Sequence, residues 1–365
     1  MEKNNKEVTE GKAQLLLSNT VFYNPKMKTL RDISVLFVKT LNEKDSSLLD
    51  CTAATGVRAI RYVKESNISD ITAIDINEEA SKMLFSNIKL NTLKGSFENV
   101  SLQEFSSRPN NKKFDFIDLD PFGTPQPYLN DIMKLVKDNT VLMITATDTA
   151  VLCGAHANAC IKIYGAKPMH NKLCKESGIR ILLMNIAKVA ATFNMGVEPI
   201  LSISDMHYMR VFVRVKYGAK KALDSLKELG FASFCKNCKE FDYKKGFVPD
   251  LERKCSYCKK ENEGFGEFYL GKIQDKKIIN KMISEDNTFV NSEAVNFLSK
   301  LSNELDIPFF YSIPDITKSL KHKSVSPDKI LNALKDKGFE GSKTQFDRDS
   351  IKTNAGVSEI IKSLE

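Results

Sequence analysis

The 365-residue chain has no tryptophan, no internal repeat and no hydrophobic run near the roughly 18 consecutive apolar residues of a membrane-spanning helix. Residues 1–12 are largely charged or polar and lack the apolar stretch of a secretory signal peptide. These absences argue against a helical membrane protein and a repeat array. They predict a soluble, cytoplasmic protein with no membrane partner and a frayed N-terminus.

The composition favours a folded protein of more than one domain. With 42% hydrophobic and 27% charged residues the chain can bury a core, and at about 150 residues per domain its length predicts two or three domains. The 54 basic residues outnumber the 46 acidic ones, and the net charge of +8 fits a polyanionic partner without requiring one. Eight cysteines in a cytoplasmic chain favour thiols and metal sites over disulfides. No obligatory protein partner is evident.

Short apolar runs alternate with amphipathic stretches over residues 47–216, which is typical of a doubly wound, mostly parallel α/β sheet. Two further runs, at 199–204 and 208–215, are separated by a short turn and are expected to form an antiparallel hairpin. This is the outline of a class I (Rossmann-like) methyltransferase, although other α/β folds share it. The expected strands are 47–51, 71–75, 114–118 and 140–145, and the expected helices are 57–66, 78–91 and 128–135.

The composition changes after Lys216. A helix ended by Gly230 is followed by a segment rich in cysteine, lysine and glycine, and the chain closes with the helix and ribbon pattern of a winged-helix-like module. The expected helices are 219–229, 276–283, 292–303, 327–337 and 356–364, with extended residues at 341–353.

These patterns predict two domains. The first is an α/β domain at 1–218, whose extension 1–45 contributes to the active site. The second is a smaller α+β domain at 219–365. It contains a zinc ribbon at 231–270 and a winged-helix-like tail at 305–365.

Four cysteines predict a metal site. Cys235, Cys238, Cys255 and Cys258 form two C-x-x-C pairs separated by 16 residues, which is the spacing of a four-thiolate zinc ribbon. Four thiolates close a tetrahedron with no open position, so the zinc is structural. A redox role is the alternative, but no thioredoxin-like strand precedes either pair.

A second group, Cys153, His156 and Cys160, also has ligand-like spacing. The same spacing suits one packed face of a helix, and we favour that interpretation. Neither Cys51 nor Cys174 predicts a role.

The first expected strand leads from Asp50 into a turn of small residues that contains Gly56, just before a helix. Such a turn lets backbone N–H groups approach a ligand. A G-x-G-x-x-G motif is absent, which disfavours a dinucleotide. Asp75 ends the second strand, where a carboxylate can bind both hydroxyls of a ribose. A strand-to-helix turn with a capping aspartate is the alternative.

Residues 120–123, Asp-Pro-Phe-Gly, follow an expected strand and carry the chemistry for alkylating an exocyclic amine. The lone pair of such an amine is delocalised into the base until hydrogen-bond acceptors localise it. The Asp120 carboxylate and the carbonyl of Leu119 or Pro121 can accept its two N–H groups, and Phe122 offers a stacking face. A tight turn with a capping aspartate is the alternative.

A series of distinctive motifs runs through nearly the whole chain. They are VFYNP at 21–25, RDISV at 31–35, ATGVRAIRY at 54–62, DLDPFGTP at 118–125, TATDTAVLCG at 145–154, GIRILL at 178–183, HYMRVFVRV at 207–215, the cysteine pairs and KTQFDRDSIKTNA at 343–355. In these motifs and their order the sequence resembles the tRNA (guanine-N2)-dimethyltransferase family. That family uses S-adenosylmethionine to convert guanine 26 of tRNA to N2,N2-dimethylguanine.

The resemblance implies a role for each matched residue. Arg31 and Arg58 would bind the carboxylate of S-adenosylmethionine and its surroundings, although each arginine has an ion pair with Asp32 or Glu65 as an alternative. The cofactor-binding set is Arg31, Arg58, Asp75, Gln103, Glu104, Asp50 and Gly56. The catalytic set is Asp120, Pro121, Phe122 and Phe22, in which the two phenylalanines hold the guanine unless they are core residues.

The sequence departs from the family pattern at a few positions. Gln103, with Glu104 as the substitute, stands where an aspartate usually binds the adenine amino group. Leu30 replaces an asparagine, Lys175 a histidine and Tyr269 a tryptophan. These differences concern the adenine pocket and fine substrate contacts rather than the reaction.

Basic and aromatic residues crowd the cysteine-rich segment and the tail, which beside a base-directed site favours an RNA-binding surface. The sequence therefore predicts an enzyme that methylates N2 of guanine 26 in tRNA, with a C-terminal tRNA-binding domain. Two alternatives are an amine methyltransferase acting on adenine N6 or on rRNA guanine, and a non-catalytic zinc-ribbon RNA-binding protein.

Overall fold

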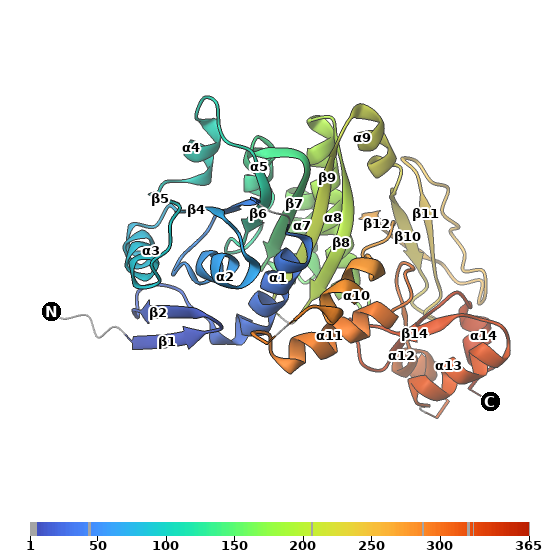
Figure 1. Cartoon of the computed structure of the whole chain (residues 1–365). Coiled ribbons are helices and arrows are strands. Elements are labelled where there is room, and N and C mark those ends of the chain that lie inside the picture. Colours follow the sequence, from blue (N-terminus) through green and yellow to red (C-terminus); the bar gives the residue numbers. More distant parts are fainter. Residues whose placement is uncertain are drawn as a thin grey trace. The chain divides into compact units, whose positions relative to one another are not determined.

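The computed structural model describes residues 6–42, 45–205, 207–286, 288–319, 322–323 and 325–364 (Figure 1). Residue contacts divide the chain into two compact units, each assembled from separate stretches. Unit 1 consists of Met1–Thr145, Phe212–Tyr217 and Lys276–Ser299, and unit 2 of Ala146–Val211, Gly218–Asp275 and Lys300–Glu365. The domain boundary expected at residue 218 stays a prediction.

Within the described residues, the central sheet has seven strands in the order β5-β4-β3-β6-β7-β9-β8. Neighbouring strands from β5 through β7 are parallel. Strands β8 and β9 are adjacent and joined by four residues, too few for a crossover, so they run antiparallel. The predicted α/β class I fold with its terminal hairpin is confirmed. The strands are β3 (Ser47–Asp50), β4 (Asp70–Asp75), β5 (Ser96–Asn99), β6 (Phe114–Leu119), β7 (Val136–Ala146), β8 (Met195–Ser204) and β9 (Met209–Tyr217).

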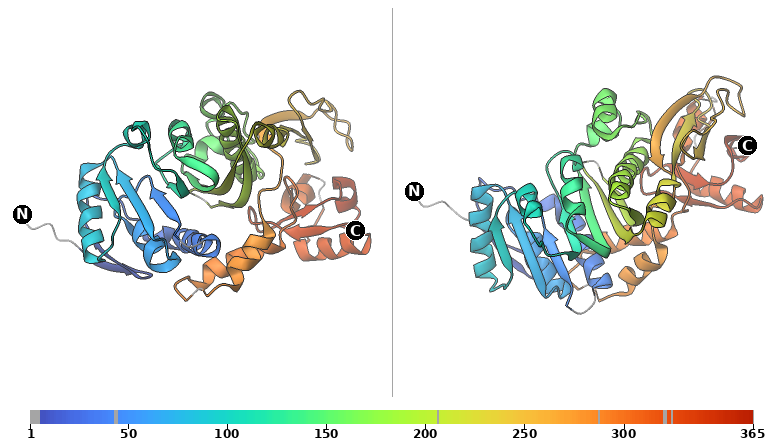
Figure 2. Two further views of the ribbon diagram at one scale, coloured as in Figure 1. Left: turned by 45° about the horizontal axis from the view of Figure 1, so that its top comes forward. Right: turned by 90° about the horizontal axis from the view of Figure 1, so that it is seen from above.

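Helices cover both faces of the parallel strands in unit 1 (Figure 2). Right-handed crossovers place α2 (Val57–Ser66) and α3 (Glu78–Leu90) on one face, and α4 (Leu102–Ser107) and α5 (Leu129–Met133) on the other. Helix α1 (Lys28–Leu41) packs against α2 and α10 (Lys276–Ser284). Because both faces are covered, every residue of β3 is buried, as a parallel strand requires.

The N-terminus begins with a hairpin of β1 (Lys6–Glu10) and β2 (Ala13–Leu17). The expectation of a frayed N-terminus is wrong from residue 6 onward. Two asparagines of α3 hold the free edge of β2, because Asn87 and Asn91 each both donate to and accept from its backbone. Leu15, an apolar residue of β2, is buried.

Unit 2 contains an antiparallel sheet in the order β11-β10-β12. The helix expected at 219–229 ends earlier, as α9 (Ala219–Leu226), because Leu229 already pairs with Tyr269 in this sheet. Long helix α8 (Cys174–Thr192) packs against β8 and β12. The strands are β10 (Leu229–Phe234), β11 (Phe241–Lys245) and β12 (Glu263–Tyr269), and two shorter helices are α6 (Thr149–Leu152) and α7 (Ala157–Tyr164).

Among its described residues, the tail of unit 2 has three helices and a small sheet in the order β13-β15-β14. The assignment of residues 305–365 as a winged-helix-like tail stays a prediction. Its elements are β13 (Tyr311–Ser312), α12 (Ile313–Ser319), α13 (Pro327–Asp336), β14 (Gly341–Lys343), β15 (Ser350–Thr353) and α14 (Val357–Ile361), and helix α11 (Ser292–Asn303) precedes them. Across the described residues, no helix has the length and hydrophobicity to cross a bilayer.

Candidate active site

The carboxyl ends of β3, β4 and β6 bring aspartates together in unit 1. Asp50 at the end of β3 lies in register with Asp118 of β6 and with Ala73 of β4, two residues before Asp75. Asp120 follows β6 directly. Ligands of open α/β sheets bind at this edge, so the sheet places the predicted acidic residues where a ligand site is expected.

The turn between β3 and α2 is shaped by unusual backbone conformations. Ala54 and Gly56 have positive φ angles of 46° and 79°. A Cβ on Gly56 would lie 2.6 Å from Leu84 Cδ1, so the turn requires glycine there for both its φ angle and its packing. Asp75 fixes this turn, because its Oδ2 accepts from Ala54 N at 2.8 Å while its Oδ1 accepts from Asn77 N at 2.8 Å. The turn-capping role of Asp75 is thus present, and its ribose role stays a prediction.

Gln103 and Glu104 lie in the first turn of α4, after β5, and both are exposed. The Ser101 hydroxyl caps this helix by accepting from Glu104 N at 3.0 Å. The cap fixes the backbone and leaves both side chains directed toward solvent. The choice between Gln103 and Glu104 as an adenine-binding residue stays open.

Asp120 is held by an arginine. Arg58 Nη2 donates to Asp120 Oδ2 at 2.5 Å, and Arg58 Nη1 lies 4.0 Å from Asp118 Oδ2. Tyr62 donates to the same Asp118 oxygen at 2.5 Å. Burial alone would lower the pKa of Arg58, but the Asp120 and Asp118 carboxylates raise this pKa well above its usual value. The ion pair with Arg58 therefore holds the Asp120 carboxylate in place at this edge of the sheet.

Asp50 lies deeper beside the same pair. It is buried, and burial together with the charge of Asp118 raises its pKa to about 8. Its Oδ1 accepts weakly from Thr52 N at 3.4 Å, whereas its Oδ2 has no hydrogen-bond partner among the described residues. A protonated carboxyl group at neutral pH is the form that suits this position.

Two aromatic rings stand beside Asp120. Phe22 is 56% exposed and Phe122 is 76% exposed, and their ring centroids are 4.9 Å apart at an interplanar angle of 82°. Neither ring belongs to the core, so the alternative of core aromatics does not hold. Large exposed apolar side chains at a ligand-binding edge are available for stacking.

Arg31 is buried and lies on α1. Its Nε and Nη2 donate to Glu10 at 2.7 and 2.5 Å, and Nη2 also donates to the carbonyl of Asn24 at 3.1 Å. The alternative of a surface ion pair with Asp32 or Glu65 is wrong for Arg31. Those two carboxylates are bound by another arginine, Arg61, at 2.7 and 2.8 Å.

Sequence reasoning missed two residues at this edge. Glu10 lies on the hairpin that was expected to be frayed, and its only sequence signal is its position in a polar and apolar alternation. Ile76 is 73% exposed directly after Asp75. The sequence signal for Ile76 is an apolar residue directly after the aspartate that ends a strand, a position from which a side chain can face a ligand.

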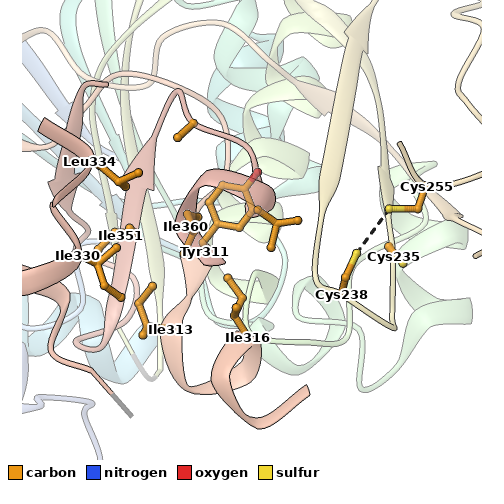
Figure 3. Close-up of a cluster of buried hydrophobic side chains, with 12 residues drawn as sticks. Cys235, Cys238, Cys255, Tyr311, Ile313, Ile316, Ile330, Leu334, Ile351 and Ile360 are labelled. Atoms are coloured by element: carbon orange, nitrogen blue, oxygen red, sulfur yellow. Dashed lines mark hydrogen bonds between the residues drawn. The ribbon is translucent and has the colours of Figure 1, made fainter. Parts of the chain in front are cut away.

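The four cysteines of the predicted ribbon lie together in unit 2, with all sulfur atoms within 4.8 Å of one another. Figure 3 shows three of them, Cys235, Cys238 and Cys255. Cys235 Sγ and Cys258 Sγ are 3.4 Å apart, as are Cys238 Sγ and Cys255 Sγ. Zinc bound at about 2.3 Å by four thiolates holds them roughly 3.8 Å apart, so the cluster fits zinc.

Each cysteine pair forms the same tight loop. Lys239 and Lys259, one residue after each pair, have positive φ angles of 70° and 64°. Their N–H groups donate to the carbonyls of Cys235 and Cys255. The repeated geometry presents two sulfurs from each loop to a common centre.

In the part of the chain that the structure describes, the four cysteines form the one group of side chains whose ligand atoms lie close enough together to hold a metal ion. The other cysteine group lies apart from it. Cys160 is fully buried, as expected for packing, but His156 is exposed. The single helix face expected for these residues is wrong, because the chain turns between α6 and α7.

The sheet order, the glycine turn and the acidic carboxyl edge define a class I methyltransferase. Over residues 2–365 the sequence matches the family model described as N2,N2-dimethylguanosine tRNA methyltransferase. The chain belongs to this family.

Relatives of known name agree along the whole chain. It is 35% identical to the tRNA (guanine(26)-N(2))-dimethyltransferase of Pyrococcus horikoshii, over 98% of both proteins. It is 36% identical to the enzyme of that name from Methanobrevibacter smithii, over 94% of this chain and 92% of the relative. The solved structure of Trm1 from Pyrococcus horikoshii with S-adenosyl-L-methionine superposes with a TM-score of 0.90 at 34% identity, covering 98% of this chain and 99% of that one.

Proposed function

We propose that this protein transfers methyl groups from S-adenosylmethionine to N2 of guanine 26 in tRNA, giving N2-methyl- and then N2,N2-dimethylguanine. The observation that carries this proposal is the Asp120 carboxylate, paired with Arg58 and two residues before Phe122, whose exposed ring contacts the exposed ring of Phe22. This combination recognises an aromatic amine and accepts its protons.

The donor side of the site is formed by the carboxyl edge of β3, β4 and β5. S-adenosylmethionine supplies an electrophilic methyl group on a sulfonium. Asp75 would accept from the ribose hydroxyls, and the exposed face of Ile76 suits an adenine ring. The arginines would bind the donor carboxylate. The whole proposed set is Arg31, Arg58, Asp75, Gln103, Glu104, Asp50 and Gly56.

The acceptor side prepares the guanine amine for attack. The Asp120 carboxylate would accept one N–H, and the carbonyl of Pro121 or Leu119 would accept the other, so the nitrogen lone pair becomes localised. As the N–C bond forms, the bond between the methyl carbon and the donor sulfur breaks, and the sulfonium leaves as the neutral thioether S-adenosylhomocysteine. Positive charge develops on the guanine nitrogen, and Asp120 would take the proton that this nitrogen releases. Most of the acceleration comes from holding the two partners in line.

Guanine 26 is stacked within the tRNA and must leave the stack to reach Asp120. Phe22 and Phe122 would hold the extruded base through their ring faces.

The cysteine cluster would hold one structural zinc ion through Cys235, Cys238, Cys255 and Cys258. The sulfur geometry supports this assignment. Four thiolates leave zinc no open position, so the ion would fix the two cysteine loops and take no part in methyl transfer.

The C-terminal region at 219–365, including the ribbon and the winged-helix-like tail, would bind the tRNA backbone. Exposed lysines of the ribbon, such as Lys236 and Lys254, support this role through attraction to phosphates. The substrate is consistent with the predicted cytoplasmic location, which stays a prediction.

Methylation of a tRNA transcript with labelled S-adenosylmethionine tests the function. A matched transcript with inosine at position 26 lacks only the N2 amine, so it separates N2 methylation from every other site. We expect label in dimethylguanine from the first transcript and none from the second. Label in the inosine transcript, in adenine or in rRNA alone would favour the other amine methyltransferases. Absence of both label and donor binding would favour the non-catalytic RNA-binding protein.

A further inference from the structure

A buried carboxylate joins the N-terminal hairpin to the candidate active site of unit 1. Glu10, the last residue of β1, is 2% exposed and accepts from three different side chains. Oε1 accepts from Arg31 Nε at 2.7 Å and from Arg61 Nη1 at 3.0 Å, and Oε2 accepts from Arg31 Nη2 at 2.5 Å and from the Tyr23 hydroxyl at 2.8 Å. Both lone-pair sites of each oxygen are thereby used.

The hairpin that carries Glu10 is fixed tightly to α2. Gly11 has a φ of 55°, and a Cβ on it would lie 2.2 Å from Glu65 Oε1. The next residue, Lys12, donates its backbone N–H to that oxygen at 2.7 Å. Because the turn tolerates no side chain and the edge of β2 is held by α3, the position of Glu10 is set by the fold rather than by its ligands.

The partners of Glu10 are the elements that the proposed site needs. Tyr23 follows Phe22 in the chain, so a fixed Tyr23 hydroxyl restricts the segment that presents the Phe22 ring. Arg31 Nη2 also donates to the carbonyl of Asn24, which ties the same segment a second time. With Nε and Nη2 engaged, the Nη1 group of Arg31 has no hydrogen-bond partner among the described residues and is left for a carboxylate.

We propose that Glu10 is a positioning residue for methyl transfer, which sets both the Arg31 guanidinium for the donor carboxylate and the Tyr23 segment for the guanine. The hairpin Lys6–Leu17 is then part of the active site although it supplies no group that touches substrate. This inference rests on the proposed function, because it uses the donor role of Arg31 and the guanine role of Phe22.

The charge on Glu10 is needed for this role. A neutral glutamine at position 10 would present an N–H group to the Arg31 guanidinium. Arg31 would then lose one of its two hydrogen bonds to residue 10, and with it its fixed orientation. The Arg61 side of the cluster would survive, because Arg61 also binds Asp32 and Glu65. Glu10→Gln should therefore disturb Arg31 more than it disturbs the fold.

The test compares Glu10→Gln with Glu7→Gln, an exposed carboxylate on the same strand. For Glu10→Gln we expect the donor Kd by calorimetry to rise about tenfold, the loss expected for a charged hydrogen bond, while Glu7→Gln stays within about twofold. In an Arg31→Met background, Glu10→Gln should add little to the donor Kd, since the two act as one unit. A purely structural role would lower the melting temperature without changing the donor Kd of the folded protein.

Tyr23→Phe tests the second arm, because it removes only the hydroxyl that Glu10 accepts from. We expect kcat/KM for tRNA to fall about fivefold with an unchanged donor Kd, the effect of one lost hydrogen bond. If Glu10→Gln fails to fold, Glu10→Asp replaces it, because the shorter side chain keeps the charge but not the reach and should raise the donor Kd in the same direction.

The inference is overturned by a folded Glu10 variant with unchanged donor Kd, or by a donor effect that persists in full without Arg31. A wild-type protein that neither binds S-adenosylmethionine nor methylates tRNA would instead overturn the proposed function, and the inference with it. A working wild type with an indifferent Glu10 variant would overturn the inference alone.

Discussion

Each unit of the molecule buries a cluster of charged side chains, but the two clusters are connected differently. In unit 1, Glu10 binds Arg31, Arg61 and the Tyr23 hydroxyl, and so reaches a segment with an exposed aromatic ring. In unit 2, Glu176 accepts from Arg180 at 2.9 Å and lies 3.2 Å from Lys352.

The cluster of unit 2 is closed by the backbone. Arg180 donates to the carbonyls of Tyr269 and Gly271, Lys352 donates to the carbonyl of Ile307, and Glu176 accepts from Phe309 N. Its bonds therefore join α8, β12, β15 and the segment before β13, and none reaches an exposed side chain. The comparison teaches that buried charge in unit 1 orients a site, whereas in unit 2 it holds strands and helices together.

We expect the largest loss of stability from changes in the proposed zinc ribbon, because its cysteine cluster, like the charged cluster of unit 2, has a structural role. Cys238→Ser, or removal of zinc by a chelator, should unfold the ribbon, because a structural zinc contributes on the order of 10 kcal/mol of binding energy to folding. Donor affinity should change less than about twofold, because the proposed donor residues lie in unit 1. Metal analysis and hydrogen exchange of residues 231–270 measure this. Lys236→Ser, an exposed residue of the same loop, is the control, and an unaltered ribbon without zinc would contradict the prediction.

The second-largest effect is expected at Asp120 and concerns the rate of methyl transfer rather than the stability of the fold. Asp120→Ala should lower kcat about a thousandfold, because it removes the acceptor for the amine proton, and it should leave the donor Kd nearly unchanged. Single-turnover methylation and calorimetry check the two parts. Asp120→Asn, which keeps an acceptor but not the charge, should retain more activity than Asp120→Ala; equal activities would argue against hydrogen-bond acceptance.

Lys352→Met should break the cluster of unit 2. Lys352 lies 3.2 Å from Glu176 and 3.3 Å from Glu304. Its loss removes the cation beside buried Glu304 and leaves Glu176 with Arg180 alone, so it should lower the free energy of unfolding by about 3 kcal/mol. Denaturant unfolding measures this loss.

Lys343→Met is the matched control for Lys352→Met. Its exposed pair with Asp328 should contribute less than about 1 kcal/mol. A large loss of donor affinity in Lys352→Met would contradict the division between the two clusters.

The smallest effect is a change in pH dependence at the active-site edge. The pKa of Asp50 is raised from 3.8 to about 8 in the folded protein, so between these values the folded state holds a proton that the unfolded state has lost. Stability from this group therefore falls as pH rises through that window. Asp50→Asn should flatten the dependence, measured as unfolding free energy from pH 4 to 8; an unchanged slope would contradict a protonated Asp50.

Much of the fold was predictable because its signals are local. The runs that became β3, β4 and β6 are largely apolar and mostly buried, as is typical of parallel strands covered on both faces, and each has acidic residues at or near its carboxyl end. The cysteine spacing likewise predicted the cysteine cluster, because each C-x-x-C loop is formed by only four consecutive residues.

The features that escaped prediction depend on partners distant in sequence. The hairpin of β1 and β2 is short, its first strand is mostly polar, and the edge of its second strand is satisfied by Asn87 and Asn91, more than 70 residues away. Likewise, Arg31 binds Glu10 rather than its neighbour Asp32, because burial of the hairpin turn brings Glu10 to it. Neither contact can be inferred from the spacing of residues in the sequence.

The edge-to-face contact of Phe22 and Phe122 has a consequence for selectivity. A base held between two rings needs roughly 7 Å from ring to ring, two van der Waals spacings, whereas these centroids are 4.9 Å apart. In the free protein the two rings contact each other, so the space between them does not admit a base. A base can enter only after the two rings move apart, and this movement costs free energy. Only a nucleotide that makes further contacts with the protein offsets that cost, so the ring pair favours such a nucleotide over other unpaired bases.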